Sequence, residues 1–314
     1  MTERTDRTER QRSEHAVETV IRPRMPIHLG LTLAPLRRGG GDPTMAVDGD
    51  GSWWRATRTP LGPVATRFAC AGGEVRVSGW GEGAEWAIEA APELLGSRDT
   101  VEGFDPPSGL VRELHRRMPG LRITRSRAVF EAIVPSIIEQ KVAGAAARDS
   151  YRAMVMAWGE AAPGPRRLRV PPAPARVAAE PYFEFHPFGI EQRRASFLRS
   201  AARYARRLEA TLDMTLSEAH RRLRALPGVG PWTAEEVAIV ALGDADAVSI
   251  GDYHLPHNVS WALAGEPRGT DERMLELLEP FRGHRGRVIR LIVASGIGAP
   301  RYGPRQPIRS FARS

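Results

Sequence analysis

The sequence predicts a mainly helical fold, α+β overall, in which a small antiparallel β-sheet with one covering helix precedes a helical bundle. Two observations support this prediction. Short apolar runs separated by glycine and proline fill residues 26–80, a pattern typical of short strands. From Leu110 onward, apolar residues recur at the three-to-four-residue spacing of amphipathic helices. The length of 314 residues suits about two domains.

Composition divides the chain into four segments. Residues 1–24 alternate acids, arginines and threonines without apolar periodicity, which predicts a disordered tail. Residues 25–103 are expected to form the sheet-and-helix domain and residues 104–298 the helical domain. Residues 299–314 are expected to be a basic C-terminal tail.

Within the first domain, four short segments are expected to be strands and one longer segment a helix. The tripeptide Ala71-Gly72-Gly73 predicts a tight hairpin, because two-residue hairpin turns favour residues that tolerate positive φ. Residues 86–95 have helical spacing and are expected to cover the sheet. The expected strands are residues 27–33, 52–58, 64–70 and 74–80.

In the second domain, amphipathic segments predict a series of helices. Residues 159–174, rich in proline, glycine and arginine, are expected to be a loop between two of them. The expected helices are residues 110–118, 127–142, 145–158, 190–208, 216–225, 234–242, 255–264, 271–281 and 288–296.

Charge and cysteine usage narrow the class of protein. The net charge of +8 indicates an anionic partner, and arginine supplies nearly all of the positive charge because Lys141 is the only lysine. A GC-rich genome would also favour arginine, but the guanidinium fork matches phosphate geometry in either case. Cys70 stands alone, which excludes an intramolecular disulfide and a cysteine-ligated metal site. Neither a membrane span nor a signal peptide is predicted, so a cytoplasmic protein is expected.

A tight hairpin between two helices is predicted at Leu226-Pro227-Gly228-Val229-Gly230-Pro231-Trp232-Thr233-Ala234. Gly228 and Gly230 let the backbone turn sharply and approach a bulky group such as a phosphate. Pro231 suits the first position of a helix, whose free amides then face outward toward an anion. An ordinary turn between two core helices would use the same residue types.

The spacing between this hairpin and a following aspartate, Asp252, is informative. Asp252 lies twenty-two residues after Gly230, which leaves room for one helix and a loop and places the acid at the mouth of the next helix. An ionised carboxylate there could stabilise positive charge that develops in a reaction. The alternative role is to cap the helix that begins near Leu255.

The hairpin and Asp252 together resemble the helix-hairpin-helix/Gly-Pro-Asp superfamily of DNA glycosylases, and most of all its 3-methyladenine DNA glycosylase II (alkylbase) branch. The resemblance covers residues 104–298 well and the first hundred residues loosely. Further segments in matching order are residues 130–142, 189–195 and 279–285.

The resemblance implies a monofunctional DNA glycosylase that hydrolyses the N-glycosidic bond of alkylated, 3-methyladenine-like or other damaged purines in base excision repair. Its expected partner is damaged duplex DNA, and a cytoplasmic, nucleoid-associated monomer that requires no cofactor is expected. Two alternatives remain: a non-catalytic helix-hairpin-helix DNA-binding protein, and a glycosylase for oxidised guanine or uracil.

Under this resemblance, Asp252 is the catalytic residue, and aromatic side chains form the pocket for a base flipped out of the duplex. Trp232, in the hairpin, and Tyr253, beside the acid, are the main pocket candidates. Phe185 and Phe188, from an aromatic run before a helix, are further candidates, with a hydrophobic core as the equal alternative for this run.

The same resemblance assigns residues to DNA binding and to an ion. DNA contacts are expected from Gly228, Gly230 and Thr233 of the hairpin, and from Gln140 and Lys141 at a DNA-facing loop. A structural Na⁺ or K⁺ is expected on the backbone carbonyls of Leu226 and Val229.

The chain departs from the family pattern at two positions. Lys141 stands where the branch carries an apolar wedge; it can hold a phosphate or cap an orphaned base, and Gln140 is then the alternative filler. Glu236 stands where the branch can place an aromatic residue. Members that also cut the DNA strand use a lysine at the position of Trp232, so no strand cleavage is expected here.

Overall fold

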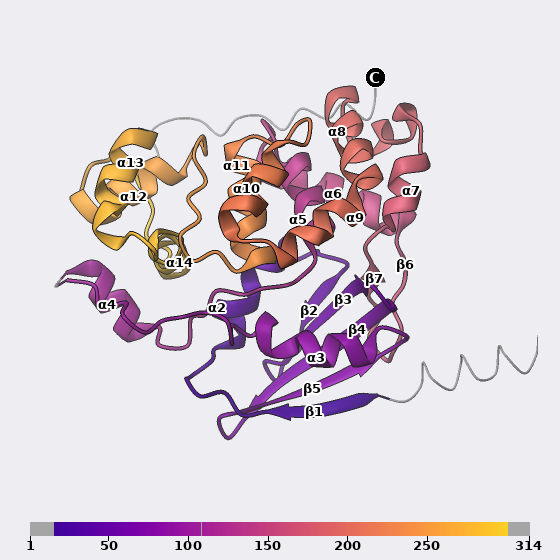
Figure 1. Cartoon of the computed structure of the whole chain (residues 1–314), viewed down its shortest axis with the longest axis horizontal. Helices are drawn as coiled ribbons and strands as arrows, with labels where there is room; N and C mark the ends of the chain where they lie inside the picture. Colours follow the sequence, from indigo (N-terminus) through magenta and orange to yellow (C-terminus); the bar gives the residue numbers. More distant parts are fainter. Residues whose placement is uncertain (1–15, 108, 301–314) are drawn as a thin grey trace, which may run out of the picture.

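The chain folds into a twisted antiparallel sheet with a layer of helices above it (Figure 1). A computed structural model describes residues 16–107 and 109–300. The predicted C-terminal tail lies almost entirely outside these residues. Figure 1 shows α3 lying against the sheet, with the helical bundle above the sheet. The predicted α+β fold is therefore confirmed.

The sheet has the strand order β1-β5-β4-β3-β2, and every neighbouring pair is antiparallel. The predicted hairpin joins β4 and β5, with Ala71 opposite Glu74. Gly72 and Gly73 both have positive φ (59° and 81°), which glycine adopts at little cost. The strands are β1 (Val17–Ile21), β2 (Met45–Val47), β3 (Trp53–Thr59), β4 (Gly62–Ala71) and β5 (Glu74–Trp80).

Two expectations for the N-terminal part are wrong. Residues 27–33 do not form a strand, because the His28 side chain accepts a hydrogen bond from the amide of Leu31 and starts the short helix α2 (Leu29–Leu33). The predicted disordered tail contains β1, which pairs with Val75–Gly79 of β5 over its whole length. Pairing with a preformed sheet edge supplies hydrogen bonds that composition does not reveal. Residues 1–15 lie outside the described part of the chain.

Both faces of the sheet are covered. Helix α3 (Ala84–Leu94) packs on one face through an apolar cluster that includes Phe68, Val77 and Ala91. On the other face Trp54 stacks on Trp80, with ring centroids 5.2 Å apart, beside the small hairpin β6–β7. This hairpin, β6 (Glu160–Ala161) and β7 (Arg169–Val170), lies in the segment predicted to be a loop.

The helical part agrees with the expected helices to within a few residues at most ends. The predicted helix 190–208 is divided at Tyr204 into α8 and α9. The α-helices are α4 (Leu110–Arg117), α5 (Val129–Ile138), α6 (Gly144–Trp158), α7 (Pro174–Ala179), α8 (Gln192–Arg203), α9 (Ala205–Glu209), α10 (Leu216–Arg224), α11 (Pro231–Val237), α12 (Leu255–Ala264), α13 (Asp271–Leu278) and α14 (Arg285–Ser295). The shorter turns are η1 (Ala34–Leu36), η2 (Tyr182–Glu184), η3 (His186–Phe188), η4 (Ala210–Asp213), η5 (Ala238–Leu242) and η6 (Glu279–Phe281).

Two apolar cores hold the bundle, and α5 is the central helix of the larger one. Nine of its ten residues are buried, and α6, α8, α9 and α11 pack around it. The second core joins α4, α12, α13 and α14. No helix in the described ranges is long and apolar enough to cross a membrane.

Polar contacts lock the sheet to the bundle. Arg55 of β3 forms an ion pair of 2.7 Å with Glu131 of α5, and Thr57 bonds to the same carboxylate. Arg287 of α14 and Asp99, which follows α3, form an ion pair in which each side chain is only 1% exposed. A buried pair of this kind is costly to break, so the site described next rests on a rigid frame.

Candidate active site

The predicted hairpin is present between α10 and α11. Gly228 has φ of +85°, and the amide of Val229 donates to the carbonyl of Leu226 at 3.0 Å to close the turn. A Cβ on Gly228 would lie 2.2 Å from the ring of Phe197 on α8. Glycine is required at this position both by backbone conformation and by this close packing.

Gly230 has a different environment. It precedes α11 with φ of −85° and ψ of −176°, and a Cβ added there would meet nothing within 4 Å. Pro231 occupies the first helical position, as predicted. Since the first amides of a helix have no intrahelical acceptor, the open surface at Gly230 is suited to an anion.

Gln140, which follows α5, holds this hairpin through two hydrogen bonds. Its Nε2 donates to the carbonyl of Gly228 at 2.8 Å and to Oγ1 of Thr233 at 2.9 Å. Thr233 is buried. The side chains of Gln140 and Thr233, both expected to contact DNA, are therefore engaged inside the protein.

Lys141 follows Gln140 and is exposed. Its φ of +55° lies in the left-handed region, which a lysine seldom adopts. The turn that positions Gln140 on the hairpin thus presents the single lysine of the chain to solvent.

Asp252 accepts hydrogen bonds on both oxygens. Its Oδ2 accepts from Nε1 of Trp232 at 3.1 Å. Its Oδ1 accepts from the amides of His254 and Leu255, each at 2.8 Å, and so caps α12. The capping role and the position beside the hairpin coexist: the cap orients the carboxylate, and the indole holds its other oxygen.

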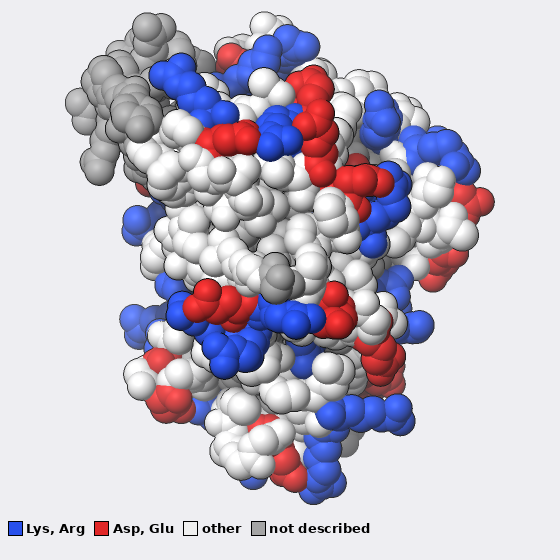
Figure 2. All heavy atoms as spheres, turned by 90° about the vertical axis from the view of Figure 1, so that its left-hand side faces the viewer, with Lys and Arg blue, Asp and Glu red and all other residues white. Residues whose placement is uncertain are grey.

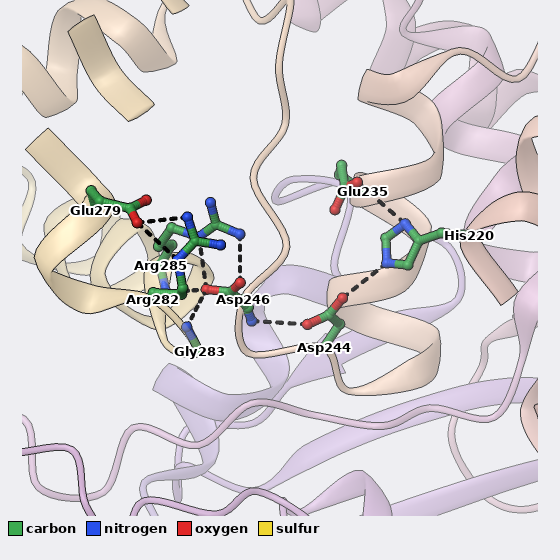
Figure 3. Close-up of polar contacts among 8 residues, drawn as sticks. All are labelled: His220, Glu235, Asp244, Asp246, Glu279, Arg282, Gly283 and Arg285. Atoms are coloured by element: carbon green, nitrogen blue, oxygen red, sulfur yellow. Dashed lines mark hydrogen bonds and ion pairs between the residues drawn. The ribbon is translucent and has the colours of Figure 1, made fainter. Parts of the chain in front are cut away.

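The loop that carries Asp252 is fixed at several points, some of which Figure 3 shows. Asp246 accepts from the amide of Gly283 at 2.7 Å and forms an ion pair with Arg285 at 2.5 Å, which ties the loop to the start of α14. The amide of Gly251 donates to Asp271 at 2.9 Å. Such supports limit the movement of a catalytic group.

His220 connects the same loop to the helices of the hairpin (Figure 3). Its Nε2 lies 2.9 Å from Oδ2 of Asp244, and its Nδ1 lies 3.2 Å from Oε1 of Glu235 on α11. Because carboxylates only accept hydrogen bonds, this geometry requires an imidazolium. The hydrogen bonds to Asp244 and then Glu235 raise the pKa of His220 to about 10. These three residues could also ligate a metal, but each ring nitrogen already faces its own carboxylate.

Sequence reasoning did not identify these anchors. The one available signal was the Asp244-x-Asp246 spacing, since Oδ1 of Asp244 accepts the amide of Asp246 in an Asx turn at 2.9 Å. His220 gave no signal, because its partners come from separate elements.

The predicted pocket aromatics separate into two groups. Tyr253 is 76% exposed beside Asp252, with its ring edge-on to His254 at 4.9 Å, so an aromatic face is free near the acid. Phe185 is fully buried and Phe188 half-buried, and both pack edge-on against Trp158. Phe185 in a base pocket is wrong for this structure, because the aromatic run plugs the core of the bundle. Phe188 packs in the same cluster.

The charge pattern does not mark a binding surface on the face near α12 and α13. Figure 2 shows basic and acidic side chains interspersed on this face. Arg273 pairs with Glu266 at 2.7 Å, and Arg282 pairs with Glu279 at 2.6 Å. The net positive charge is therefore not gathered into one patch here.

The sequence and the fold were compared with those of known proteins. No model of a known protein family matches the chain. In the solved structures, a 3-methyladenine DNA-glycosylase from Archaeoglobus fulgidus has the same fold, with a TM-score of 0.73 and 22% identity over 88% of this chain and 98% of the other. An 8-oxoguanine glycosylase/lyase from Clostridium acetobutylicum, in complex with double-stranded DNA, has a TM-score of 0.69 and 14% identity over 90% and 97% of the two chains. The fold is that of the DNA glycosylases.

Sequence similarity to characterised proteins narrows the class of DNA glycosylase that the chain resembles. The chain is 31% identical over 173 residues to the probable bifunctional transcriptional activator/DNA repair enzyme AlkA of Mycobacterium tuberculosis, covering 54% of this chain and 33% of the relative. It is 30% identical over 181 residues to DNA-3-methyladenine glycosylase 2 of Escherichia coli, covering 56% and 62%. The chain thus spans less than two thirds of the length of either relative. The resemblance to helix-hairpin-helix DNA glycosylases, and to their 3-methyladenine glycosylase II branch, is confirmed.

Proposed function

We propose that this chain is a monofunctional DNA glycosylase that hydrolyses the N-glycosidic bond of alkylated or otherwise damaged purines as a step of base excision repair. The observation that carries the proposal is the contact between Trp232 of the hairpin and Asp252 of the following loop. This contact brings the carboxylate of Asp252 next to the hairpin and its indole ring.

Asp252 is the proposed catalytic residue. As the bond between the sugar C1′ and the base nitrogen breaks, positive charge develops on the sugar, and a fixed carboxylate stabilises it. The same carboxylate can orient the water that attacks C1′. The cap on α12 keeps one oxygen in place while the other faces Trp232.

Aromatic side chains would hold the flipped base. The exposed ring of Tyr253 follows Asp252 directly in sequence, and the half-buried indole of Trp232 is hydrogen-bonded to its carboxylate. A base that carries positive charge after alkylation is attracted to such faces and leaves without a proton from the protein. A single carboxylate is then sufficient for this class of substrate.

DNA would be positioned through its backbone. The open amide surface at Gly230 is proposed to bind a phosphate, and Lys141, exposed on the neighbouring turn, to contact a second phosphate or the orphaned base. Because one chain supplies every one of these groups, we propose a monomer that acts on chromosomal DNA in the cytoplasm.

A monovalent cation is compatible with the hairpin. Within the described residues, the amide of Val229 is the backbone donor to the Leu226 carbonyl, so this oxygen retains a lone pair, and carbonyl oxygens are ligands of Na⁺ and K⁺. We propose that the carbonyls of Leu226 and Val229 would hold such an ion, which would add positive charge for a DNA phosphate.

The test is release of free base from synthetic duplexes that each carry one defined lesion: 3-methyladenine, 7-methylguanine, 8-oxoguanine or uracil. Release of the two methylated purines with little of the others is expected. Specific binding without release of any base would favour the non-catalytic alternative, and preferential release of 8-oxoguanine or uracil would favour the other glycosylase activity.

A further inference from the structure

A second carboxyl group lies beside the candidate catalytic acid. Trp232 and Glu236 are four residues apart on α11 and so share one face of the helix. Trp232 contacts Asp252, and Oε1 of Glu236 accepts from the Ser249 hydroxyl at 2.5 Å. Both contacts join the same face of α11 to residues 249–252. Glu236 therefore lies about one helical turn, roughly 5.4 Å, from Trp232 along this helix, next to the candidate site.

Burial sets the character of this carboxyl group. Within residues 16–107 and 109–300, the Ser249 hydroxyl is the hydrogen-bond donor to Glu236, and no basic side chain forms an ion pair with it. Burial raises the pKa of Glu236, and the Ser249 hydrogen bond only partly opposes this. The protonated form is therefore favoured here more than on a surface glutamate.

The surrounding charges come from four other parts of the fold. Arg38, which follows η1, lowers the pKa of Glu236, whereas Glu139 at the end of α5 and Asp252 raise it. Arg38 is itself paired with Glu139 at 3.5 Å. Arg290 of α14 is half-buried, and burial lowers its pKa to about 10, with Glu236 acting in the opposite direction. Neither arginine neutralises Glu236 through an ion pair.

Two carboxyl groups in different environments can divide acid and base roles. Asp252, held by N–H donors, acts as the carboxylate, and a protonated Glu236 would be a hydrogen-bond and proton donor. We propose that Glu236 is a specificity-determining residue that donates a proton to uncharged damaged purines and so extends the activity beyond cationic alkylated bases. This inference rests on the proposed glycosylase function.

The proposed step balances as a hydrolysis. The bond between C1′ and the base nitrogen breaks and its electron pair stays with the base. The Glu236 O–H bond breaks and its proton goes to a ring nitrogen of the base. Water adds its oxygen to C1′, and the proton it releases restores the Glu236 acid through solvent. A cationic base needs no such proton, because it leaves as a neutral molecule.

The experiment compares two duplexes, one with hypoxanthine as an uncharged damaged purine and one with 7-methylguanine as a cationic base. Single-turnover release is measured for the wild type, Glu236→Gln and Glu89→Gln, a charge-matched control on the exposed side of α3. Glutamine keeps an acceptor for Ser249 but has no acidic proton. Thermal unfolding of each variant checks that the fold is retained.

We expect Glu236→Gln to slow hypoxanthine release at least tenfold and 7-methylguanine release less than threefold. The wild-type rate on hypoxanthine should fall as pH rises through the pKa of Glu236, and this pH dependence should be absent in the variant. Equal effects on both bases, or a loss confined to 7-methylguanine, would overturn the proton-donor role.

Failure of the proposed function gives a different pattern. If the wild type releases neither base, the glycosylase proposal falls and this inference with it. If the wild type releases 7-methylguanine and Glu236→Gln leaves hypoxanthine release unchanged, only the inference about Glu236 falls. If Glu236→Gln unfolds, Ser249→Ala tests the same carboxyl group, because it removes the hydrogen bond that opposes protonation of Glu236. The pH at which the rate of hypoxanthine release falls should then be higher than in the wild type. An unchanged pH dependence would contradict the proposal.

Discussion

The indole nitrogen of Trp232 lies 3.1 Å from Oδ2 of Asp252, and this hydrogen bond joins the hairpin helix to the loop that carries the acid. The hairpin proposed to bind the DNA backbone is therefore connected directly to the group proposed to act on the sugar. The loop has further supports at Asp244 and Asp246, so movement of Asp252 relative to the hairpin is restricted.

Asp252→Asn should reduce base excision by about 10²–10³-fold, because it removes the charge that stabilises the sugar cation. The asparagine carbonyl can still cap α12 through the amides of His254 and Leu255, so the fold should be retained. Affinity for lesion-containing DNA should stay similar or rise, since a negative charge beside DNA is repulsive. Single-turnover release and binding by fluorescence anisotropy check both parts, and near-normal release would refute the assignment.

The two hairpin glycines should respond differently to substitution. Gly228→Ala should destabilise the protein by about 1–3 kcal/mol, because it combines a strained backbone with a clash against Phe197. Gly230→Leu should leave the melting temperature nearly unchanged, since space is open there, and should weaken DNA binding on damaged and undamaged duplexes alike. Unchanged affinity in Gly230→Leu would mean that the hairpin is only a structural turn.

Gln140 and Lys141 are neighbours with separate roles. Gln140→Ala removes two hydrogen bonds to the hairpin and should lower stability by about 0.5–1.5 kcal/mol for each bond. Lys141→Ala should leave stability unchanged and reduce the slope of log affinity against log salt by about 1, as expected for loss of one phosphate contact. Urea unfolding and salt-dependent binding of both variants separate the effects. An unaltered salt slope in Lys141→Ala would contradict a phosphate contact.

Local rules predicted much of the fold but little of the support around the site. The hairpin Gly72-Gly73 and the helix start at Pro231 follow from backbone preferences of single residues, so they could be read from the sequence. Strand β1 could not, because its stability comes from pairing with β5 rather than from its own composition. The short apolar run at residues 27–33 predicts a strand, but the hydrogen bond from the Leu31 amide to the His28 side chain starts a helix there.

The candidate site shows the same limit. The spacing from the hairpin predicts Asp252 beside it, whereas the aromatic run leaves pocket and core as equal alternatives for Phe185, and its burial decides for the core. His220 and Ser249 acquire their roles only through partners that are distant in the sequence. Contacts of this kind depend on tertiary packing, which periodicity and motif spacing do not encode.

The His220 bridge should make stability depend on pH. A histidine whose pKa rises from 6.5 to about 10 on folding contributes stability that is fully present below pH 6.5 and is lost as pH rises toward 10. His220→Gln should therefore be less stable than the wild type at pH 6, and the difference should shrink by pH 10. Urea unfolding at pH 6, 8 and 10 measures this, with His186→Gln as a control. A difference that does not vary with pH would rule out the imidazolium.

Strand cleavage should be absent from the reaction. A lyase that cuts the strand needs an amine that attacks the sugar and forms a Schiff base. The residue beside Asp252 is the indole of Trp232, and the only lysine is Lys141, on the exposed turn after α5. The product should be an intact abasic strand that breaks only after alkali or heat, and borohydride added during turnover should trap no protein–DNA adduct. An adduct that forms with the wild type and disappears in Lys141→Ala would identify this lysine as a nucleophile and overturn the monofunctional assignment.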